Sequence, residues 1–569
     1  MKSMNIVVLS GGSGNDALIK GIKSLYKESN VKVVVNAYDS GKSTGICRKV
    51  TDTLGVSDIR KNHTRMYKAM TRNPDKRIME FYDNRYDFTV GNEVNEIGEL
   101  LVKWGLGMLF PYVERFFSNK DASMYEYKDF SVANIIYSQM YKEHGYEDTN
   151  KFFCDLLEID DFVILNSFDN VYLNAITEDG RVIYDEGDIV ELKNPNNKIV
   201  SLDYVGDKSH GINPKAVEAV MNADLLVIST GTFWSSIYPT IEYLDFYKYV
   251  NASKAKKIWA INNEEDKDAY GVTSNDFIKI METAGLDLSQ FTILENIDAV
   301  NTLRQLNPNY NIAYASMENN KGKHNGNKYA AEILRLYYNL NGQYDKIIFD
   351  FDDTLWARGS NKDDIEASIE NIQLVMDKLG DKTVIVSGNS FDSIKNKLYR
   401  VFGTNLKGFD IPIWADANST LYVGGKVCDT IKEMSIAPYY EKLQKYLKSE
   451  YGIESQINDS GFPVCLKIKP LERRERDILS RYLNDFILKD MGADACVAVK
   501  TGTTTIDILS KKNNKAMVMD RMDKDIRTLY IGDEIDGGND SDIANMCTNF
   551  VHTSGVSETN MLIKLLGGL

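Results

Sequence analysis

The chain has 569 residues, which is too long for one ordinary hydrophobic core, and we expect at least two folded units. Hydrophobic residues (43%) and charged residues (26%) occur in globular proportions, which excludes global disorder, and the net charge of −15 disfavours nucleic acid and anionic membrane as partners. Six scattered cysteines without a C-x-x-C pair, and an N-terminus without a signal cleavage pattern, predict a cytoplasmic protein.

The first part of the chain alternates predicted strands and helices. The apolar run at residues 4–10 predicts a buried strand, two glycines end it, and an amphipathic helix is predicted at residues 16–26. Further strands are predicted at residues 31–37, 162–166, 223–229 and 257–262. This alternation predicts an α/β fold.

A change of composition marks the boundary between the two predicted units. Residues 307–327 are rich in Asn, Gly and Lys, a helix is predicted at residues 329–340, and a new strand begins after Gly342. We therefore predict domains at residues 1–342 and 343–569. In the second domain, strands are predicted at residues 346–349, 383–386 and 529–531.

Acidic and hydroxyl side chains follow these three strands. Asp350 and Asp352 come after the first strand, and the alternation of an extended chain points them the same way. Two carboxylates held that close raise each other's pKa unless a cation compensates, and oxygen ligands suit magnesium. Ser387 follows the second strand, and an acidic loop at residues 532–542 follows the third. Because open α/β sheets hold ligands at the carboxyl ends of strands, we predict a magnesium and phosphate site there.

The spacing of these motifs resembles the four motifs of the haloacid-dehalogenase superfamily. They are D-x-D-x-T at residues 350–354, the strand-end Ser387, a lysine, and a G-D pair followed by an N-D pair at Asp533 and Asp540. The resemblance implies a Rossmannoid core that hydrolyses phosphomonoesters, because an acid stands at Asp352.

The long gap after Ser387 predicts an inserted α/β cap at about residues 391–500. The sequence W-A-D-A-N at residues 414–418 is similar to a segment that precedes the cap in the Cof and phosphomannomutase-like branch of the superfamily. The resemblance therefore places the second domain in this capped branch.

The superfamily resemblance implies a role for each motif residue. Asp350 is the expected nucleophile, which would form an aspartyl-phosphate, and Asp352 is the expected acid and base. Ser387 and Lys515 are expected to hold the phosphoryl group during transfer. The implied magnesium ligands are Asp350, Asp352, Asp533 and Asp540.

Two of these assignments have alternatives in the sequence. Lys515 is preferred to Lys500 and Lys511 because N-N-K-A fits the asparagine and lysine turn of the superfamily. Asp540 is preferred to Asp536 because it belongs to the N-D pair.

The first domain contains a glycine-rich turn and two charged segments. Residues 10–15 read S-G-G-S-G-N between a strand and a helix, where free amides and the helix dipole favour phosphate. The segments D-S-G-K-S-T-G-I-C-R at residues 39–48 and G-V-S-D-I-R at residues 55–60 follow. In order and spacing these segments resemble the CofD/YvcK family, and the stretches around Asn134 and at residues 229–239 agree with that resemblance.

The CofD/YvcK resemblance implies a Rossmann-like domain that handles a nucleotide-linked phosphometabolite. Transferase members move a phospholactyl group from a nucleoside-diphosphate carrier to an alcohol, whereas YvcK members bind uridine-diphosphate sugars. The implied ligand-binding residues are Gly12, Ser13, Gly14, Asn15, Asp39, Ser43, Thr44, Arg48, Asp58 and Arg60. Ser40 and Lys42 stand where the family has an acid and a glycine, so we expect Lys42 and Arg48 to neutralise a diphosphate directly.

Together these features predict a bifunctional enzyme. The second domain is expected to be a Mg²⁺-dependent phosphatase, and the first a transferase that acts on a nucleoside-diphosphate conjugate. Small phosphorylated metabolites are the expected partners, and the sequence leaves the oligomeric state open. Two alternatives remain, in which the first domain is a nucleotide-sugar-binding regulator of the phosphatase or the second domain is a phosphomutase.

Overall fold

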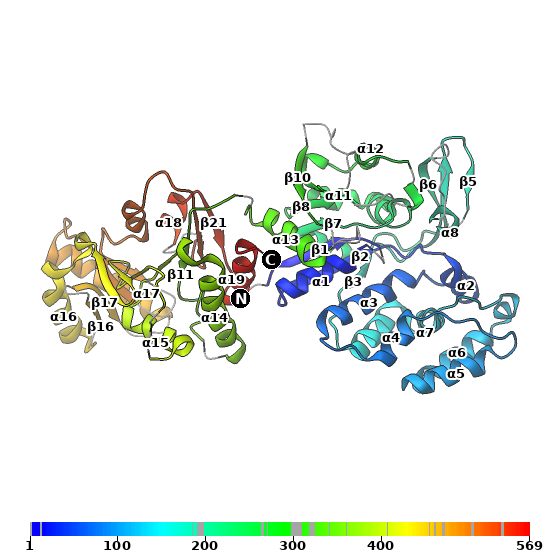
Figure 1. Cartoon of the computed structure of the whole chain (residues 1–569), viewed down its shortest axis with the longest axis horizontal. Coiled ribbons are helices and arrows are strands. Elements are labelled where there is room, and N and C mark those ends of the chain that lie inside the picture. The colour runs from blue at the N-terminus through cyan, green and yellow to red at the C-terminus, as the bar shows by residue number, and fades with distance from the viewer. Residues whose placement is uncertain are drawn as a thin grey trace. The chain divides into compact units, whose positions relative to one another are not determined.

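We describe the protein from a computed structural model of the whole chain (Figure 1). The structure describes residues 3–11, 14–184, 186–190, 198–262, 267–269, 271–297, 310–317, 325–340, 342–359, 361–404, 406, 408–453, 456–459, 463–468, 473–501, 506–535 and 540–568. The chain divides into two compact units, Ser3–Tyr337 and Tyr338–Leu569. Among the described helices, none is both long and apolar enough to cross a membrane.

A seven-stranded parallel sheet forms the centre of the first unit, which confirms the predicted α/β class. Its strands are β1 (Asn5–Leu9), β2 (Asn30–Val35), β3 (Val163–Leu165), β7 (Leu225–Ile228), β8 (Lys256–Ala260), β9 (Phe291–Asn296) and β10 (Asn311–Ala315). Their order is β10-β9-β8-β7-β1-β2-β3, so the chain adds strands first on one side of β1 and then on the other. Ligands of open α/β sheets bind in the crevice at such a reversal of strand order.

Helices connect these strands, and the first helix of the unit packs against two others. They are α1 (Asp16–Leu25), α2 (Lys42–Thr51), α3 (Ser57–Met70), α4 (Lys76–Asp83), α5 (Glu93–Trp104), α6 (Phe110–Phe117), α7 (Val132–Leu157), α8 (Glu186–Val190), α9 (Pro214–Met221), α10 (Tyr238–Glu242), α11 (Tyr247–Ala252), α12 (Ser274–Ala284) and α13 (Gly326–Tyr337). Helix α1 packs against α13 and α3. A glycine is needed at the crossing, because a Cβ on Gly21 would lie 2.0 Å from the carbonyl oxygen of Gly326.

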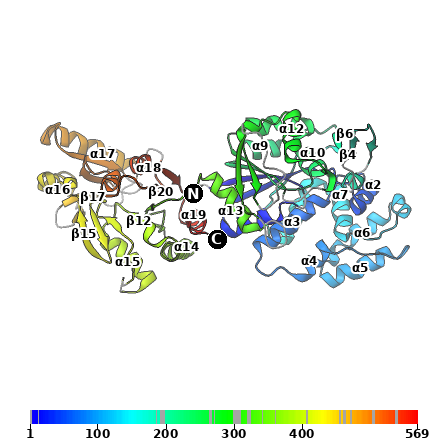
Figure 2. The ribbon, with the colours of Figure 1, turned by 45° about the horizontal axis from the view of Figure 1, so that its top comes forward.

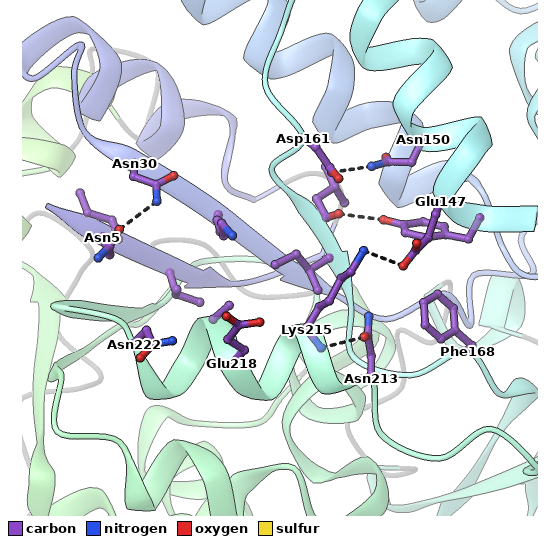
Figure 3. A pocket seen from close by; sticks show the side chains of 17 residues that line it. Asn5, Asn30, Glu147, Asn150, Asp161, Phe168, Asn213, Lys215, Glu218 and Asn222 are labelled. Atoms are coloured by element: carbon purple, nitrogen blue, oxygen red, sulfur yellow. Dashed lines mark hydrogen bonds and ion pairs between the residues drawn. The ribbon is translucent and has the colours of Figure 1, made fainter. Parts of the chain in front are cut away.

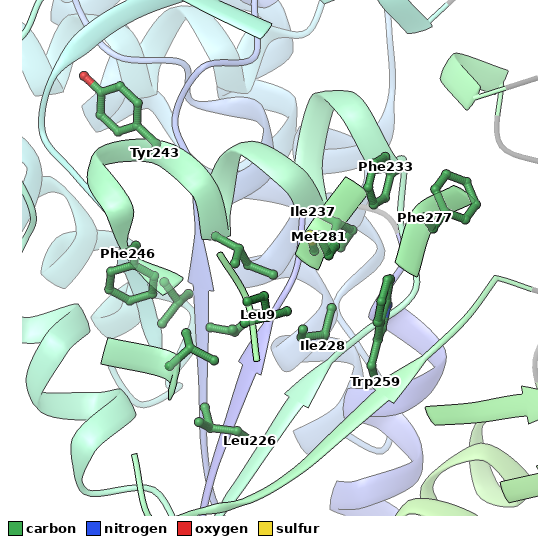
Figure 4. Close-up of a cluster of buried hydrophobic side chains, with 14 of the residues drawn as sticks. Leu9, Leu226, Ile228, Phe233, Ile237, Tyr243, Phe246, Trp259, Phe277 and Met281 are labelled. Carbon is green, nitrogen blue, oxygen red and sulfur yellow. The ribbon is translucent and has the colours of Figure 1, made fainter. Parts of the chain in front are cut away.

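One face of the parallel sheet carries a large apolar core (Figure 4). Leu9 of β1 and Ile228 of β7 meet Trp259 of β8 there, and Phe277 and Met281 of α12 cover them. A separate antiparallel sheet in the order β5-β4-β6 lies in the same unit; it consists of β4 (Asn170–Thr177), β5 (Val182–Ile183) and β6 (Ile199–Asp207). The buried core holds the strands of the parallel sheet in place, so the loops that follow their carboxyl ends start from fixed positions.

A second seven-stranded sheet forms the centre of the second unit. Its order is β15-β14-β13-β12-β11-β20-β21, parallel from β13 to β21 and antiparallel at β14 and β15. The strands are β11 (Lys346–Asp350), β12 (Thr383–Val386), β13 (Ile413–Ala415), β14 (Thr420–Val423), β15 (Lys426–Thr430), β20 (Thr528–Gly532) and β21 (Asn549–His552). The helices are α14 (Lys362–Leu374), α15 (Phe391–Phe402), α18 (Ser541–Met546) and α19 (Val556–Leu566).

A four-stranded antiparallel sheet is inserted into this unit between β15 and β20. Its order is β16-β17-β19-β18, with β16 (Gln456–Asp459), β17 (Pro463–Ile468), β18 (Val497–Thr501) and β19 (Ile506–Ser510). Helices α16 (Ala437–Tyr451) and α17 (Arg473–Phe486) pack on one of its faces (Figure 2). The sheet extends to Ser510, and β13, β14 and β15 pair with the parallel sheet, so the inserted layer lies later in the chain than the predicted span of residues 391–500.

Candidate active sites

The carboxyl ends of three neighbouring strands meet in the second unit. Strand β11 lies between β12 and β20, and it ends at Asp350. Ser387 follows β12, and Asp533 follows β20. The parallel pairing therefore brings these three side chains, which are far apart in sequence, to one edge of the sheet.

Three carboxylates converge at this edge. Asp350, Asp533 and Asp540 each offer an oxygen, and these oxygens lie within 4.8 Å of one another. The ammonium group of Lys515 donates to Asp350 Oδ1 at 2.9 Å and also to Asp540. Asp350, Asp540 and Lys515 are buried, and the Thr354 hydroxyl donates to Asp533 Oδ1 at 3.3 Å. The structure therefore brings together Asp350, Lys515, Asp533 and Asp540, which are four of the site residues predicted from the motifs.

Burial and mutual repulsion perturb the ionisation of this cluster. Burial raises the pKa of the Asp350 carboxyl well above its usual range. The negative charges of Asp540 and Asp533 raise this pKa further, whereas the positive charge of Lys515 lowers it. Burial, followed by repulsion from Asp540, raises the pKa of Asp533 to about 6. Burial opposes protonation of Lys515, but the carboxylates of Asp350 and Asp540 outweigh it and raise the pKa of its ammonium group. One lysine does not neutralise three acids, so the cluster favours an additional cation.

The donor set of the cluster fits a magnesium ion. Carboxylate oxygens are hard ligands, and Mg²⁺ is commonly held by one or two carboxylates together with phosphate oxygens and water. Asp350, Asp533 and Asp540 are the residues that would hold it. The side chain of Asp352, which the sequence also suggested as a ligand, lies outside this group of three.

The chain turns directly after Asp350, and this turn explains the position of Asp352. Asp350 is the last residue of β11, Asp352 forms an isolated bridge with Trp356, and Asp353 has a φ of 58°. The alternation of an extended chain therefore does not apply between Asp350 and Asp352.

The carboxylate of Asp352 is instead surrounded by donors. Lys397 Nζ of α15 lies 2.5 Å from Asp352 Oδ1. The side-chain amide of Asn389 donates to Asp352 Oδ2, and the Ser387 hydroxyl does so at 3.4 Å. Ser387 is thus close to Asp352, beside the carboxylate cluster.

Lys397 and Asn389 are candidate site residues that the sequence motifs did not reveal. The available signal was weak: Asn389 follows Ser387 by two positions, and Lys397 lies in the helix directly after that strand end. A lysine in such a helix is ordinarily a solvated residue, and only the folded arrangement brings its ammonium group to Asp352.

The structure also separates the alternatives for the site lysine. Lys515 contacts Asp350, whereas Lys500 lies on β18 and donates to the carbonyl oxygen of Asn513 at 3.3 Å. Lys511 is exposed, and its ammonium group lies 3.5 Å from the carbonyl oxygen of Ala493. Asp536, the alternative to Asp540, lies outside the described residues.

In the first unit, the loops after β1 and β7 touch where the strand order reverses. A Cβ on Gly14 would lie 1.7 Å from the carbonyl oxygen of Thr230, and the Thr230 hydroxyl donates to the Gly14 carbonyl at 2.8 Å. A Cβ on Gly11 would lie 2.3 Å from Ser236 Oγ and 3.3 Å from Asp58 Oδ2. The glycine turn, the β7 loop and the start of α3 are therefore in close contact, which leaves no room for a side chain at Gly11 or Gly14.

The predicted residues of the glycine turn are partly described. The buried Asn15 side chain donates to Asn62 Oδ1 at 2.8 Å, which joins the turn to α3. Gly12 and Ser13 lie outside the described residues.

A cavity of about 830 Å³ is lined by residues of α2, α3 and α8 and of the loop before α2. Asp39, Lys42, Ser43, Thr44 and Lys61 are among the residues that line it. The Ser43 and Thr44 hydroxyls each accept a hydrogen bond from the side-chain amide of Asn134, at 2.9 and 3.2 Å. Asn134 thus holds Ser43 and Thr44 in place, two of the residues that the CofD/YvcK resemblance assigned to ligand binding.

Three acids approach one another around the cavity. Burial raises the pKa of the Asp58 carboxyl, and Asp39 raises it further while Lys61 opposes both. Burial and then Asp39 raise the pKa of Glu186 well above its usual range. Burial acts in the same direction on Asp39, but Lys61 and the Gly41 amide hold the pKa of Asp39 below its usual value. Glu186 was not among the residues predicted from the sequence to bind a ligand.

Two predicted arginines do not face the cavity. Arg48 is fully buried, and its guanidinium donates to the carbonyl oxygens of Val171 at 2.7 Å and Tyr38 at 3.1 Å and to Asn170 Oδ1 at 2.8 Å. Arg60 is also buried and donates to the carbonyl oxygen of Tyr82. Because backbone carbonyls and Asn170 take up the donors of Arg48, we interpret Arg48 as structural, contrary to the expectation that it neutralises a diphosphate. For Arg60 the described residues show this one backbone contact, and its buried Nε has no hydrogen-bond partner among them.

A smaller cavity of about 340 Å³ lies near the amino ends of β1 to β3 (Figure 3). Asn5 and Asn30, the first residues of β1 and β2, line it, and Lys215 of α9 pairs with Glu147 of α7 across it at 2.6 Å. The predicted site residues belong to the opposite edge of the sheet.

The structure thus defines an α/β protein of two units, and each parallel sheet carries polar and acidic side chains at the carboxyl ends of its strands, where open α/β sheets bind ligands. The chain belongs to the CofD family, because the family model described as 2-phospho-L-lactate transferase CofD matches residues 6–336. This match confirms the resemblance found in the first domain.

Individual relatives cover parts of the chain. A gluconeogenesis factor of Listeria innocua serovar 6a is 27% identical over 258 residues, which is 45% of this chain and 66% of that protein. The chain therefore spans slightly less than two thirds of that relative. A crystal structure of a Bacillus halodurans protein has a TM-score of 0.44 at 19% identity and covers 58% of this chain and 100% of that chain. The structure of an N-terminal truncated Plasmodium falciparum IMP-nucleotidase has a TM-score of 0.30 at 17% identity and covers 42% of this chain and 74% of that chain.

Proposed function

We propose that the second unit is a magnesium-dependent phosphomonoester hydrolase that works through an aspartyl-phosphate. One observation carries the proposal: the buried Asp350 carboxylate lies at a strand end, 2.9 Å from the Lys515 ammonium group and within 4.8 Å of the carboxylates of Asp533 and Asp540. A nucleophile, a cation for the transferring oxygens and a set of metal ligands are thus assembled at one point.

The residues support a two-step mechanism. Asp350 attacks the phosphorus, the bond to the ester oxygen breaks, and the departing oxygen takes a proton from Asp352. Asp352 then accepts a proton from water as the water attacks the aspartyl-phosphate, which releases phosphate and regenerates Asp350. Ser387 and Lys515 bind the oxygens of the phosphoryl group during both steps. A magnesium ion held by Asp350, Asp533 and Asp540 would neutralise the charge of the phosphate and the nucleophile as they meet.

Lys397 has a positioning role in this proposal. Its ammonium group lies 2.5 Å from Asp352 Oδ1, and Asn389 holds the other oxygen of the same carboxylate. These contacts hold Asp352 apart from the metal ligands, where it is available for proton transfer.

Phosphate release from a panel of phosphomonoesters, in magnesium and in excess chelator, tests the proposal. We expect release that requires the metal. Labelled sugar phosphates in the same assay distinguish hydrolysis from a phosphomutase, because a mutase exchanges isomers without net phosphate loss. The absence of metal-dependent release from the whole panel would contradict the hydrolase proposal.

We propose that the first unit binds a nucleoside-diphosphate conjugate at the carboxyl edge of its sheet and transfers its phosphorylated group. The family match, the glycine turn against Thr230 and the cavity beside Asp39 support this proposal. The main alternative is a regulator that binds a nucleotide sugar without turnover.

A thermal-shift screen with nucleotide sugars, combined with an assay for nucleoside monophosphate release, separates the two functions. A transferase is expected to give both a shift and release of the nucleotide in the presence of an acceptor alcohol. Binding without release would support the regulator.

A further inference from the structure

Three charged residues form a row across the inserted sheet. Lys467 of β17 pairs with Asp507 of β19, and Asp507 pairs in turn with Lys500 of β18. Directly opposed residues of antiparallel strands project to the same face of a sheet. The row therefore lies on one face and carries a net charge of about +1 from its two lysines and one aspartate.

This face is the one turned away from the helices of the insertion. The apolar residues of the other face, which include Leu466 and Ile508, pack with Leu443 of α16 and Leu483 of α17. Because neighbouring residues of a strand alternate between faces, Lys467 and Asp507 lie on the side opposite to α16 and α17.

The charged face is turned toward the parallel-sheet core of the same unit. Cys465 and Leu509, which pair with each other across β17 and β19, form a buried apolar cluster with Ala417 after β13. This contact anchors one end of the face on the core. Lys467 and Asp507 lie two residues away along the same strands, and therefore follow directly on the same face.

Both lysines of the row reach the edges of the proposed active site. Lys467 Nζ donates to Asn389 Oδ1 at 3.1 Å, and the amide of Asn389 donates to Asp352. Lys500 Nζ donates to the carbonyl oxygen of Asn513 at 3.3 Å, and Asn513 lies two positions before Lys515. The row thus extends from the side of the acid and base to the side of the phosphate-binding lysine.

We propose that Lys467 and Lys500 form a subsite for a second anionic group of the substrate, either a carboxylate or a second phosphate. This inference rests on the proposed phosphatase function. Each ammonium group has three N–H donors, and the oxygen it contacts among the described residues is neutral, so donors remain for an anion. The charged hydrogen bonds hold the second group above the reacting phosphoryl group.

Matched substrate pairs test this subsite with the full-length protein in magnesium. One pair is glycerol 3-phosphate and 3-phosphoglycerate, which differ by a carboxylate, and the other is glucose 6-phosphate and glucose 1,6-bisphosphate. We expect kcat/KM to be roughly tenfold or more higher for the doubly anionic member of at least one pair, the effect of one charged hydrogen bond. The pair that shows the preference identifies the second group as carboxylate or phosphate.

The variants Lys467→Met and Lys500→Met are each expected to lower that ratio of kcat/KM values roughly tenfold. Lys467→Arg retains the charge and is expected to retain most of the ratio. If Lys467→Met does not fold, the ratio of the Lys500→Met variant decides whether the subsite exists. Lys448→Met, on the exposed surface of α16, is the matched control and should leave the ratio unchanged.

Two results would overturn the inference, and they have different meanings. Phosphate release from both members of each pair without a preference, or a ratio that the lysine variants do not change, contradicts the subsite and leaves the phosphatase intact. Metal-dependent release from none of the four compounds contradicts the phosphatase proposal and the subsite together.

Discussion

The two units place polar side chains at the carboxyl edge of a parallel sheet, but they use their charged residues differently. In the second unit, the buried Lys515 is bonded to the carboxylates of Asp350 and Asp540. In the first unit, the buried Arg48 is bonded to carbonyl oxygens of the scaffold. We therefore interpret Lys515 as a residue of the proposed site and Arg48 as part of the scaffold, and the motifs alone do not distinguish the two roles.

The largest effect is expected at the nucleophile of the second unit. Asp350→Asn removes the attacking carboxylate, and we expect metal-dependent phosphate release to fall by at least about a thousandfold. Steady-state phosphate release from p-nitrophenyl phosphate in magnesium measures this loss.

Asp377→Asn is a suitable control for that substitution, because Asp377 is exposed and distant in sequence from the motif residues. Its activity should equal that of the wild type. An Asp350→Asn protein that retains most of the activity would remove the basis for the nucleophile assignment and for the contrast between the two units.

Arg48→Met tests the structural interpretation of the arginine in the first unit. The substitution leaves several buried carbonyl oxygens without their donor, at a cost of about 1–3 kcal/mol each, so we expect the free energy of unfolding to fall by about 3 kcal/mol or more. Chemical denaturation followed by tryptophan fluorescence measures the change, and the exposed Arg72→Met is the control. A stable variant that loses only ligand affinity would instead place Arg48 in the binding site.

Gly14→Ala tests the close contact between the β1 and β7 loops. The added Cβ would lie 1.7 Å from the Thr230 carbonyl oxygen, so the backbone must shift, at a cost of about 1–3 kcal/mol. We expect a lower melting temperature and weaker nucleotide binding in a thermal-shift assay. Gly107→Ala is the control, because the nearest atom to its new Cβ is 4.0 Å away. Equal behaviour of the two variants would argue against close contact of the loops.

Much of this arrangement could be predicted from the sequence, because apolar β-branched runs define buried strands and parallel strands end at one edge. Asp350 was found in this way, whereas Lys515 was found through the resemblance of its N-N-K-A segment to a motif of the haloacid-dehalogenase superfamily. The contact of Lys397 with Asp352 could not be predicted, since it depends on a turn at Asp353 that breaks the alternation of the strand. The burial of Arg48 was equally hidden, because Val171, 123 positions away, accepts from it.

Lys42 gives the smallest expected effect and the sharpest contrast with Arg48, since both were expected to neutralise a diphosphate. The Lys42 side chain is 76% exposed, lines the larger cavity and lies 3.5 Å from Asp129. For an exposed charge of this kind, Lys42→Met should weaken binding of a nucleoside diphosphate by about 1 kcal/mol, roughly fivefold in Kd, without a measurable change in stability. Titration calorimetry measures the affinity, with the exposed Lys27→Met as control. If Lys42→Met instead destabilises the protein and leaves Kd unchanged, its pairing with Asp129 is structural, and the ligand must be bound by the amides of the glycine turn.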